Sequence, residues 1–155
     1  MKKPKRNDPS ATDRGMLPEL VGYHLRRAQN AVFNHFIDSL TDHGVSPGQF
    51  GVLTLIDANE GLSQSALAKT LGIERSTMVA VIDRLEAQGW VDRKLSETDR
   101  RSYALALTEA GTELLSRARP QVRSHEHQIN ADLSDAEKAM LIDLLDRVAR
   151  AAGNR

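Results

Sequence analysis

The sequence predicts a mainly α-helical fold with one small antiparallel β-hairpin. Three observations support this prediction. Over most of the chain, apolar residues recur at every third or fourth position, as they do on the buried face of a helix. Serine or threonine precedes most of these stretches and glycine follows several of them, which is typical of helix starts and ends. Between Gly89 and Thr108 the apolar residues instead alternate with polar ones, which indicates two strands.

The composition is that of a globular protein with an aliphatic core. Of 155 residues, 40% are hydrophobic and only 4% are aromatic, a size that fits one domain with helical extensions. No apolar stretch approaches the ~20 residues that span a bilayer, and the N-terminus lacks the apolar segment of a signal peptide. We therefore expect a cytoplasmic protein with no membrane partner. The absence of cysteine excludes disulfides, thiolate metal sites and thiol-based redox sensing.

The N-terminal part of the chain predicts a tail followed by a long helix. Residues 1–16 are polar, basic and rich in helix breakers, so they predict a flexible tail, with a DNA-binding arm as the alternative. An apolar stripe then begins at Leu17 and continues to Leu40. Because Gly44 follows this stripe, we expect one amphipathic helix that ends before it.

Three shorter helices are predicted next. Ser46 and Gln49 have the spacing of a capping box, in which each side chain binds the backbone N–H of the other residue. This pattern predicts the start of a second helix. Capping and glycine signals predict a third helix over 63–72 and a fourth over 75–88.

The remaining elements are a hairpin and two helices. Alternation predicts strands around 91–95 and 103–107. Thr108 has the preference of an N-cap for a fifth helix, within which Pro120 predicts a kink or a break. Residues 134–137 repeat the capping-box pattern and predict a sixth helix.

Residues 67–81 have the pattern of two helices that cross at a tight turn. Ala68 permits close approach of the helices, Gly72 suits the turn, and apolar residues can pack the two together. Small and polar residues remain on the outer face of the second helix, where they can enter a DNA major groove. An ordinary helical hairpin is the alternative. The DNA contacts expected from these helices are Ser65, Arg75, Ser76, Thr77, Val79, Ala80 and Arg84.

The hairpin that follows favours DNA binding, because its tip is basic. Arginine at such a tip can enter a narrow minor groove, where the negative potential is enhanced, and a nearby carboxylate can orient it. A solvated hairpin whose charges maintain solubility is the alternative. Residues 74–103 contain six basic and six acidic residues, so nonspecific attraction to DNA alone would not select this surface. The contacts expected from the hairpin are Arg93, Lys94, Asp99, Arg100 and Arg101.

Two stretches resemble the MarR family of bacterial regulators. Asp99-Arg100-Arg101, the SYALA that comes next and the later Leu107-Thr108 match the wing signature of that family. The preceding LGIERSTMVAVIDRLEAQGWVDR resembles its recognition helix and first wing strand. The order of the predicted helices fits the family from about residue 17 to the C-terminus.

This resemblance implies a winged helix-turn-helix domain over 45–108 and dimerisation helices over 17–44 and 109–155. It implies a homodimer that reads a pseudo-palindromic double-stranded DNA operator, with Arg101 in the minor groove and Asp99 as its positioning partner. The apolar faces of the terminal helices support the dimer, because a monomer would leave them partly exposed. Repression is the expected mode of regulation, and activation is the alternative.

The resemblance also implies a small-molecule effector, because members of the family commonly bind small aromatic acids that release DNA. The YHLRRAQ run in the first helix resembles regulators that respond to hydroxycinnamoyl-CoA thioesters. This implies an aromatic acyl-CoA whose phosphates meet basic residues and whose acyl group lies near Phe50. A free aromatic acid, no effector, or a merely solvated helix face are the alternatives. The candidate ligand-binding residues are Tyr23, His24, Arg26, Arg27, Asn30 and Phe50.

No cofactor, metal site or catalytic centre is predicted. His125 and His127 could suggest a metal site, but neighbouring helix positions diverge in direction, so surface histidines are the preferred interpretation. The chain has no glycine-rich phosphate loop or nucleophile elbow, and we expect no enzyme activity. The alternative function is a winged-helix protein-interaction module that buries its recognition face in a partner protein.

Overall fold

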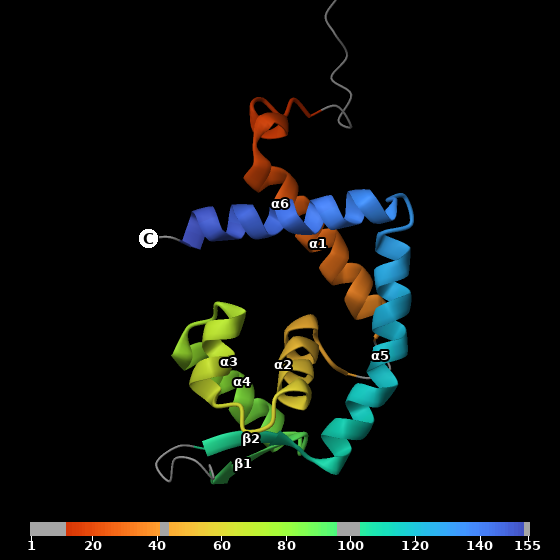
Figure 1. The fold of residues 1–155 in the computed structure, drawn as a ribbon. Coiled ribbons are helices and arrows are strands. Elements are labelled where there is room, and N and C mark those ends of the chain that lie inside the picture. Colours follow the sequence, from red (N-terminus) through yellow and green to blue (C-terminus); the bar gives the residue numbers. More distant parts are fainter. Residues whose placement is uncertain (1–11, 41–43, 96–102, 154–155) are drawn as a thin grey trace, which may run out of the picture. The chain divides into compact units, whose positions relative to one another are not determined.

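A computed structural model describes residues 12–40, 44–95 and 103–153 of the chain. It confirms the predicted fold class, a mainly helical protein with one two-stranded antiparallel sheet (Figure 1). The chain divides into two compact units, Met1–Asn34 and His35–Arg155, and the boundary falls within the first α-helix. Among the described residues, no helix is both long and apolar enough to cross a membrane.

The N-terminal helix begins later than the apolar stripe predicted. Residues Leu17–Glu19 form a short 3-10 turn, η1, and α1 follows over Val21–Ser39. Leu20 separates the two, because its backbone is extended, with φ −95° and ψ 121°. The expectation of one continuous helix from residue 17 was therefore wrong at its first turn, where Pro18 favours a tight helical turn but donates no backbone hydrogen bond.

The next three helices begin where the sequence predicted, and the last two of them also end there. They are α2 (Pro47–Ala58), α3 (Gln64–Leu71) and α4 (Arg75–Ala87). The capping box of α2 is confirmed, because Gln49 Oε1 accepts a hydrogen bond from the Ser46 N–H at 2.9 Å and Ser46 Oγ accepts one from the Gln49 N–H at 3.3 Å. The sequence thus specifies the entry of the chain into α2 through local contacts alone.

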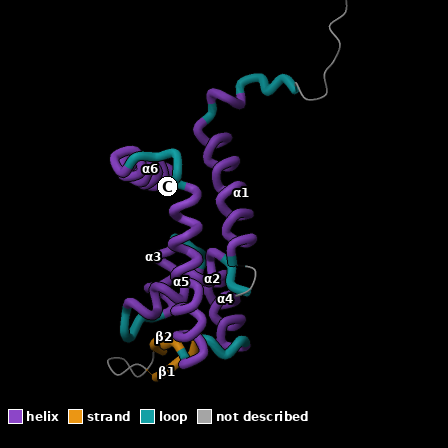
Figure 2. The backbone as a smooth tube through the Cα atoms, turned by 90° about the vertical axis from the view of Figure 1, so that its right-hand side faces the viewer, coloured by secondary structure: helices purple, strands orange, loops and turns teal. Residues whose placement is uncertain are grey.

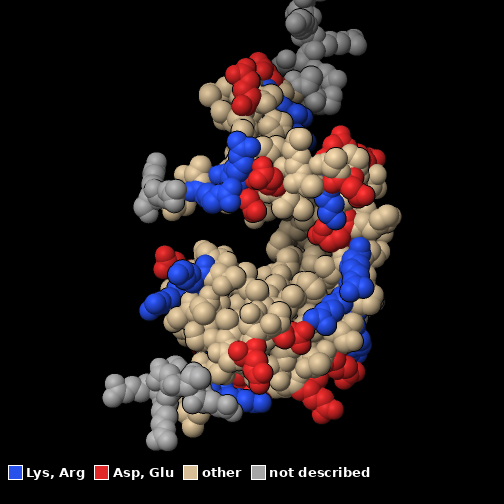
Figure 3. Space-filling model, in the orientation of Figure 1, with Lys and Arg blue, Asp and Glu red and all other residues tan. Residues whose placement is uncertain are grey.

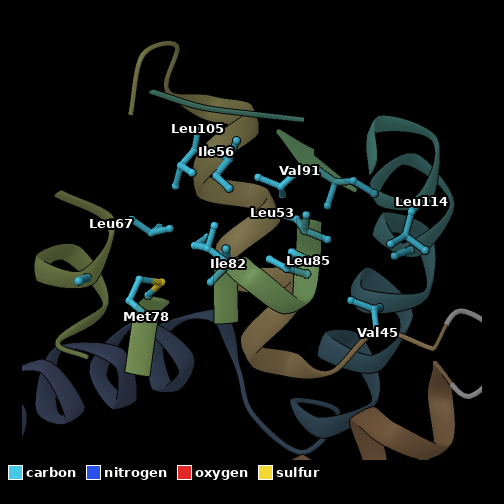
Figure 4. Packing of buried hydrophobic residues seen from close by; sticks show 14 of the residues in the cluster. Val45, Leu53, Ile56, Leu67, Met78, Ile82, Leu85, Val91, Leu105 and Leu114 are labelled. Atoms are coloured by element: carbon cyan, nitrogen blue, oxygen red, sulfur yellow. The ribbon is translucent and has the colours of Figure 1, made fainter. Parts of the chain in front are cut away.

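The crossing of α3 and α4 is the centre of the core. Gly72 ends α3 in the left-handed conformation, with φ 62° and ψ 31°, which a residue without a side chain adopts at no steric cost. The turn brings Leu67 of α3 and Met78 of α4 into the same buried cluster, and both are fully buried. Figure 4 shows Leu67, Met78 and Ile82 converging between the two helices.

The hairpin closes one side of this core. Strands β1 (Val91–Leu95) and β2 (Tyr103–Leu107) pair antiparallel, with Val91 opposite Leu107 and Arg93 opposite Leu105. Figure 2 shows the two strands as a small orange hairpin in an otherwise helical chain. The Leu105 N–H donates to the Leu62 carbonyl at 2.9 Å, so β2 is anchored to the segment before α3 as well as to β1.

The last two helices are α5 (Glu109–Ile129) and α6 (Asp135–Gly153). The helix α5 continues without a break through Pro120, so the predicted alternative of a break at that residue was wrong. The capping box predicted for α6 is confirmed, because Ser134 Oγ accepts from the Glu137 N–H at 3.3 Å and Glu137 Oε2 accepts from the Ser134 N–H at 2.9 Å. None of the described residues of α6 is buried.

The start of α5 packs directly on the turn between α4 and β1. Thr108 donates its N–H to the Trp90 carbonyl at 3.1 Å and its hydroxyl to the Gly89 carbonyl at 2.6 Å, and its oxygen caps the Gly111 N–H at 3.0 Å. A side-chain Cβ at Gly111 would lie 2.0 Å from the Trp90 carbonyl oxygen. Gly111 is therefore required by the close approach of two backbone segments.

One buried polar contact joins the C-terminal end of α1 to α5. The His125 side chain is 2% exposed, and its Nδ1 lies 2.7 Å from Nδ1 of His35, so one ring donates a hydrogen bond and the other accepts it. The preference for surface histidines was wrong for His125, because it faces α1 while His127 is exposed. No cluster of three or more metal-binding side chains occurs among the described residues.

Burial and the nearby His35 lower the pKa of His125 below its ordinary value, although Glu126 acts in the opposite direction. Protonation of both rings would place two hydrogens and two charges between nitrogens only 2.7 Å apart. The contact therefore requires at least one neutral ring, and it depends on pH.

We expect Gly111→Ala to lower the free energy of unfolding by about 3 kcal/mol or more, because the new methyl group would force the Trp90 carbonyl to move. Gly51→Ala is the matched control. A Cβ at Gly51 meets nothing within 4 Å inside α2, so this change should raise stability by about 0.5–1 kcal/mol. Urea denaturation of both variants measures the difference, and equal stabilities would contradict the close approach.

We expect the free energy of unfolding to fall as pH decreases below 6.5, the ordinary pKa of histidine. Below that pH the unfolded chain protonates His125 while the folded chain keeps it neutral, until pH reaches the lowered folded pKa. The slope contributed can reach about 1.4 kcal/mol per pH unit. His125→Gln should remove this contribution and His127→Gln should retain it in urea denaturation at a series of pH values. An unchanged slope in His125→Gln would contradict the assignment.

Candidate nucleic-acid interface

The outer surface of α4 forms the candidate contact with DNA. Met78, Ile82 and Leu85 hold the inner side of the helix in the core. The small and polar residues that the sequence placed on the outer side are all exposed, including the apolar Val79 at 41%. We call this surface the recognition face, and it comprises Arg75, Ser76, Thr77, Val79, Ala80 and Arg84.

A shallow groove lies beside the first turn of this helix. It has a volume of about 480 Å³ and extends from Ser65 and Lys69 on α3 to Glu74 and Arg75 at the start of α4. The first backbone N–H groups of a helix have no partner within the helix, and the helix dipole is positive at that end. Side chains and backbone donors at this groove therefore suit a phosphate group.

The two basic residues of β1 face opposite sides of the hairpin. Arg93 is opposite Leu105, which is buried, so its side chain points toward the helices, while Lys94 is exposed. The Arg93 guanidinium donates to Asp83 Oδ1 at 2.6 Å and also to Glu86 on α4. The sequence did not predict this ion-pair network. The predicted contacts Asp99, Arg100 and Arg101 lie outside the described residues.

The face of the molecule drawn in Figure 3 carries no single basic patch among the described residues. On the face drawn in Figure 3, Lys and Arg side chains lie among Asp and Glu side chains. This distribution agrees with the net charge of zero. A contact of the recognition face with DNA would therefore rest on the position of particular side chains more than on a general positive potential.

The candidate ligand-binding residues of α1 form a mixed aromatic and basic surface. The Arg27 guanidinium carbon lies 5.6 Å from the centre of the Tyr23 ring, a cation–π contact that leaves its N–H groups available to an anion. His24 donates from Nε2 to the Pro18 carbonyl at 2.8 Å. Arg26 and Asn30 are exposed and complete this set.

Phe50 lies on α2, in the other unit of the chain, where it packs against the core. Its ring centre is 6.2 Å from that of Phe36. Thr54 is one turn further along α2, and its hydroxyl is buried with no hydrogen-bond partner. Gln121 Oε1, on the neighbouring α5, is also buried without a hydrogen-bond partner. Unpaired buried polar atoms are costly, so a polar group bound there would be stabilised.

Comparison with known proteins relates this arrangement to transcriptional regulators. The sequence profile of the MarR family matches residues 43–102. A putative transcriptional regulatory protein for the hcr operon of Thauera aromatica is 42% identical over 149 residues, which cover 96% of this chain and 90% of the relative.

Two structures of the transcriptional repressor CouR are similar to most of this chain. One is bound to a 23-mer DNA duplex and is 40% identical to this chain. The other is bound to p-coumaroyl-CoA and is 39% identical. Each has a TM-score of 0.83, and each alignment covers 90% of this chain and 99% of the CouR chain.

Proposed function

The chain belongs to the MarR family of transcriptional regulators, and we propose that it is a homodimeric repressor that an aromatic acyl-CoA thioester releases from its operator. The observation that carries this proposal is the exposed recognition face of α4, set on a buried helix crossing and followed by a hairpin. The likeness to CouR, which has been solved with a DNA duplex and with p-coumaroyl-CoA, supports both halves of the proposal.

The proposed DNA contacts divide by their chemistry. The first turns of α4 enter the major groove, where Arg75 and Ser76 reach base edges and Val79 or Ala80 makes apolar contact. The wing enters the minor groove through Arg101, oriented by Asp99 and supported by Arg100. The contacts to phosphate groups come from Ser65, Thr77, Arg84 and Lys94.

Exposed apolar side chains on α6 support the proposed dimer. Burial of apolar surface contributes about 25 cal/mol per Å², so a helix that exposes six large apolar residues favours a second copy of the chain. A two-fold axis would place the two recognition faces about 34 Å apart, one turn of DNA. The six residues are Met140, Leu141, Ile142, Leu144, Leu145 and Val148, each 39% to 64% exposed.

The proposed effector is a hydroxycinnamoyl-CoA thioester such as p-coumaroyl-CoA. Arg26 and Arg27 on α1 suit the nucleotide phosphates, because a planar guanidinium binds phosphate oxygens in pairs. The aromatic acyl group would lie near Phe50, where the unpaired Thr54 hydroxyl and Gln121 carbonyl offer partners for a phenol. Release requires that the ligand bind more tightly to a dimer conformation that does not fit the operator.

We expect the purified protein to bind one fragment of DNA from upstream of its own coding region with nanomolar affinity, and p-coumaroyl-CoA to release it. Fluorescence anisotropy across a salt series measures the binding, with free p-coumarate and coenzyme A as the matched controls. Arg101→Ala should weaken binding by a few kcal/mol without unfolding the protein.

The outcomes of this experiment are distinct. Release by free p-coumarate alone would replace the thioester with an aromatic acid as effector. Binding that no compound relieves would contradict the effector and leave the regulator. Absence of selective binding to any upstream fragment would contradict the regulator and favour the protein-interaction module.

We expect the wild-type protein to sediment as two 17.1 kDa chains and the double variant Leu141→Glu/Leu145→Glu to sediment as one. The two leucines are one turn apart and exposed at 44% and 40%, so the new carboxylates would be desolvated in an interface. Asp143→Ala on the same helix removes only an exposed ion pair and should remain dimeric. A monomeric wild type in analytical ultracentrifugation would contradict the proposed dimer.

A further inference from the structure

Arg93 connects the hairpin to both helices of the helix-turn-helix. Its guanidinium donates to Asp83 at 2.6 Å and to Glu86 on α4, and it lies 3.4 Å from Gln64 Oε1 in the first turn of α3. The side chain is 25% exposed. A single partly buried group therefore holds three elements at a defined mutual position.

The register of the hairpin explains why this arginine faces the helices. Side chains alternate between the two faces of a strand, and Arg93 shares its face with Val91, which is buried. Its cross-strand partner Leu105 is also buried. The next residue, Lys94, is exposed on the opposite face. The Arg93 guanidinium is thus directed at the carboxylates of α4 and not at the side of the hairpin where Lys94 lies.

The position of these carboxylates on α4 gives the ion pairs a further role. Asp83 follows Val79 and Ala80 by one helical turn, so it continues the recognition face, and its side chain is 56% exposed. A carboxylate at this place would repel the phosphates of a bound duplex unless a cation compensates it. Arginine suits this task, because its planar guanidinium is always charged and can bind two carboxylates at once.

We propose that Arg93 is a positioning residue, which fixes the wing against the recognition helix and compensates Asp83 and Glu86 without contacting DNA itself. This inference rests on the proposed DNA-binding function. It assigns the two neighbouring basic residues of β1 to different tasks, since Lys94 remains a proposed contact to phosphate. The wing then reaches the minor groove at a position set by the same helix that reads the major groove.

A double-mutant cycle tests whether Arg93 acts through the two carboxylates. Arg93→Met should weaken operator binding at least about tenfold in the wild-type background and less than about threefold in the Asp83→Asn/Glu86→Gln background. Fluorescence anisotropy measures affinity, and urea denaturation confirms that each variant is folded. If Arg93→Met does not fold, Arg93→Lys takes its place in the cycle, because lysine keeps the charge but not the planar two-carboxylate geometry.

The salt dependence separates positioning from direct contact. Loss of one phosphate contact lowers the slope of log affinity against log salt by about 0.9. In the Asp83→Asn/Glu86→Gln background, where Arg93 has no carboxylate to compensate, Arg93→Met should leave this slope unchanged, whereas Lys94→Met, the matched control on the same strand, should lower it in either background. Such results would support the positioning role, which a purely structural effect on stability would not reproduce.

Two results would overturn the inference while the proposed function stands. Equal losses of affinity in both backgrounds would show that Arg93 does not act through Asp83 and Glu86. A slope lowered by about 0.9 when Arg93→Met is added to the Asp83→Asn/Glu86→Gln background would show a direct phosphate contact. If the wild type and Lys94→Met both fail to bind any upstream fragment, the proposed function fails, and this inference fails with it.

Discussion

The packing of α4 across α3 is the constraint on which the rest of the structure depends. Leu67 and Met78 are both fully buried in the same cluster, and the left-handed Gly72 permits the turn that brings the two helices together. This contact decides which side of α4 is buried and hence which residues form the recognition face. Substitutions on the exposed side can alter what the helix binds at little cost in stability, whereas the inner side must retain both volume and apolar character. Under the proposed function, binding specificity and folding stability thus depend on opposite faces of the same helix.

The hairpin and α5 extend this constraint outward through backbone contacts. Trp90 accepts a hydrogen bond from Thr108, and Gly111 leaves room for that carbonyl, so the first turn of α5 is seated on the exit of α4. Arg93 secures the hairpin to α4 by ion pairs. The first turn of α5 is therefore held in place against the end of α4 and the start of β1. A change in the direction of α5 must either move this whole junction or arise further along the helix.

Local signals predicted most of the fold, and long-range packing accounts for what they missed. Caps at Ser46, Ser63 and Thr108 act over three or four residues, which is why the helix starts were predictable. The outward orientation of the recognition face followed from helical periodicity. Burial of His125 was not predictable, because it depends on where the end of α1 lies in space, and periodicity gave no sign of its partner His35. For Arg93, alternation predicted a strand, but only the register with β2 reveals which face meets α4.

Pro120 lies in the middle of α5, within an unbroken helix. Because proline has no N–H, the carbonyl of Ser116, four residues earlier, lacks its usual partner in the helix. The bending stiffness of α5 is therefore lowest near its centre, between the fixed junction at Thr108 and the histidine contact at His125. A force on one end of this helix would therefore bend it near Pro120 before it displaced the helix as a rigid body. If α5 bends, the missing hydrogen bond at Ser116 makes the middle of the helix the place where bending costs least.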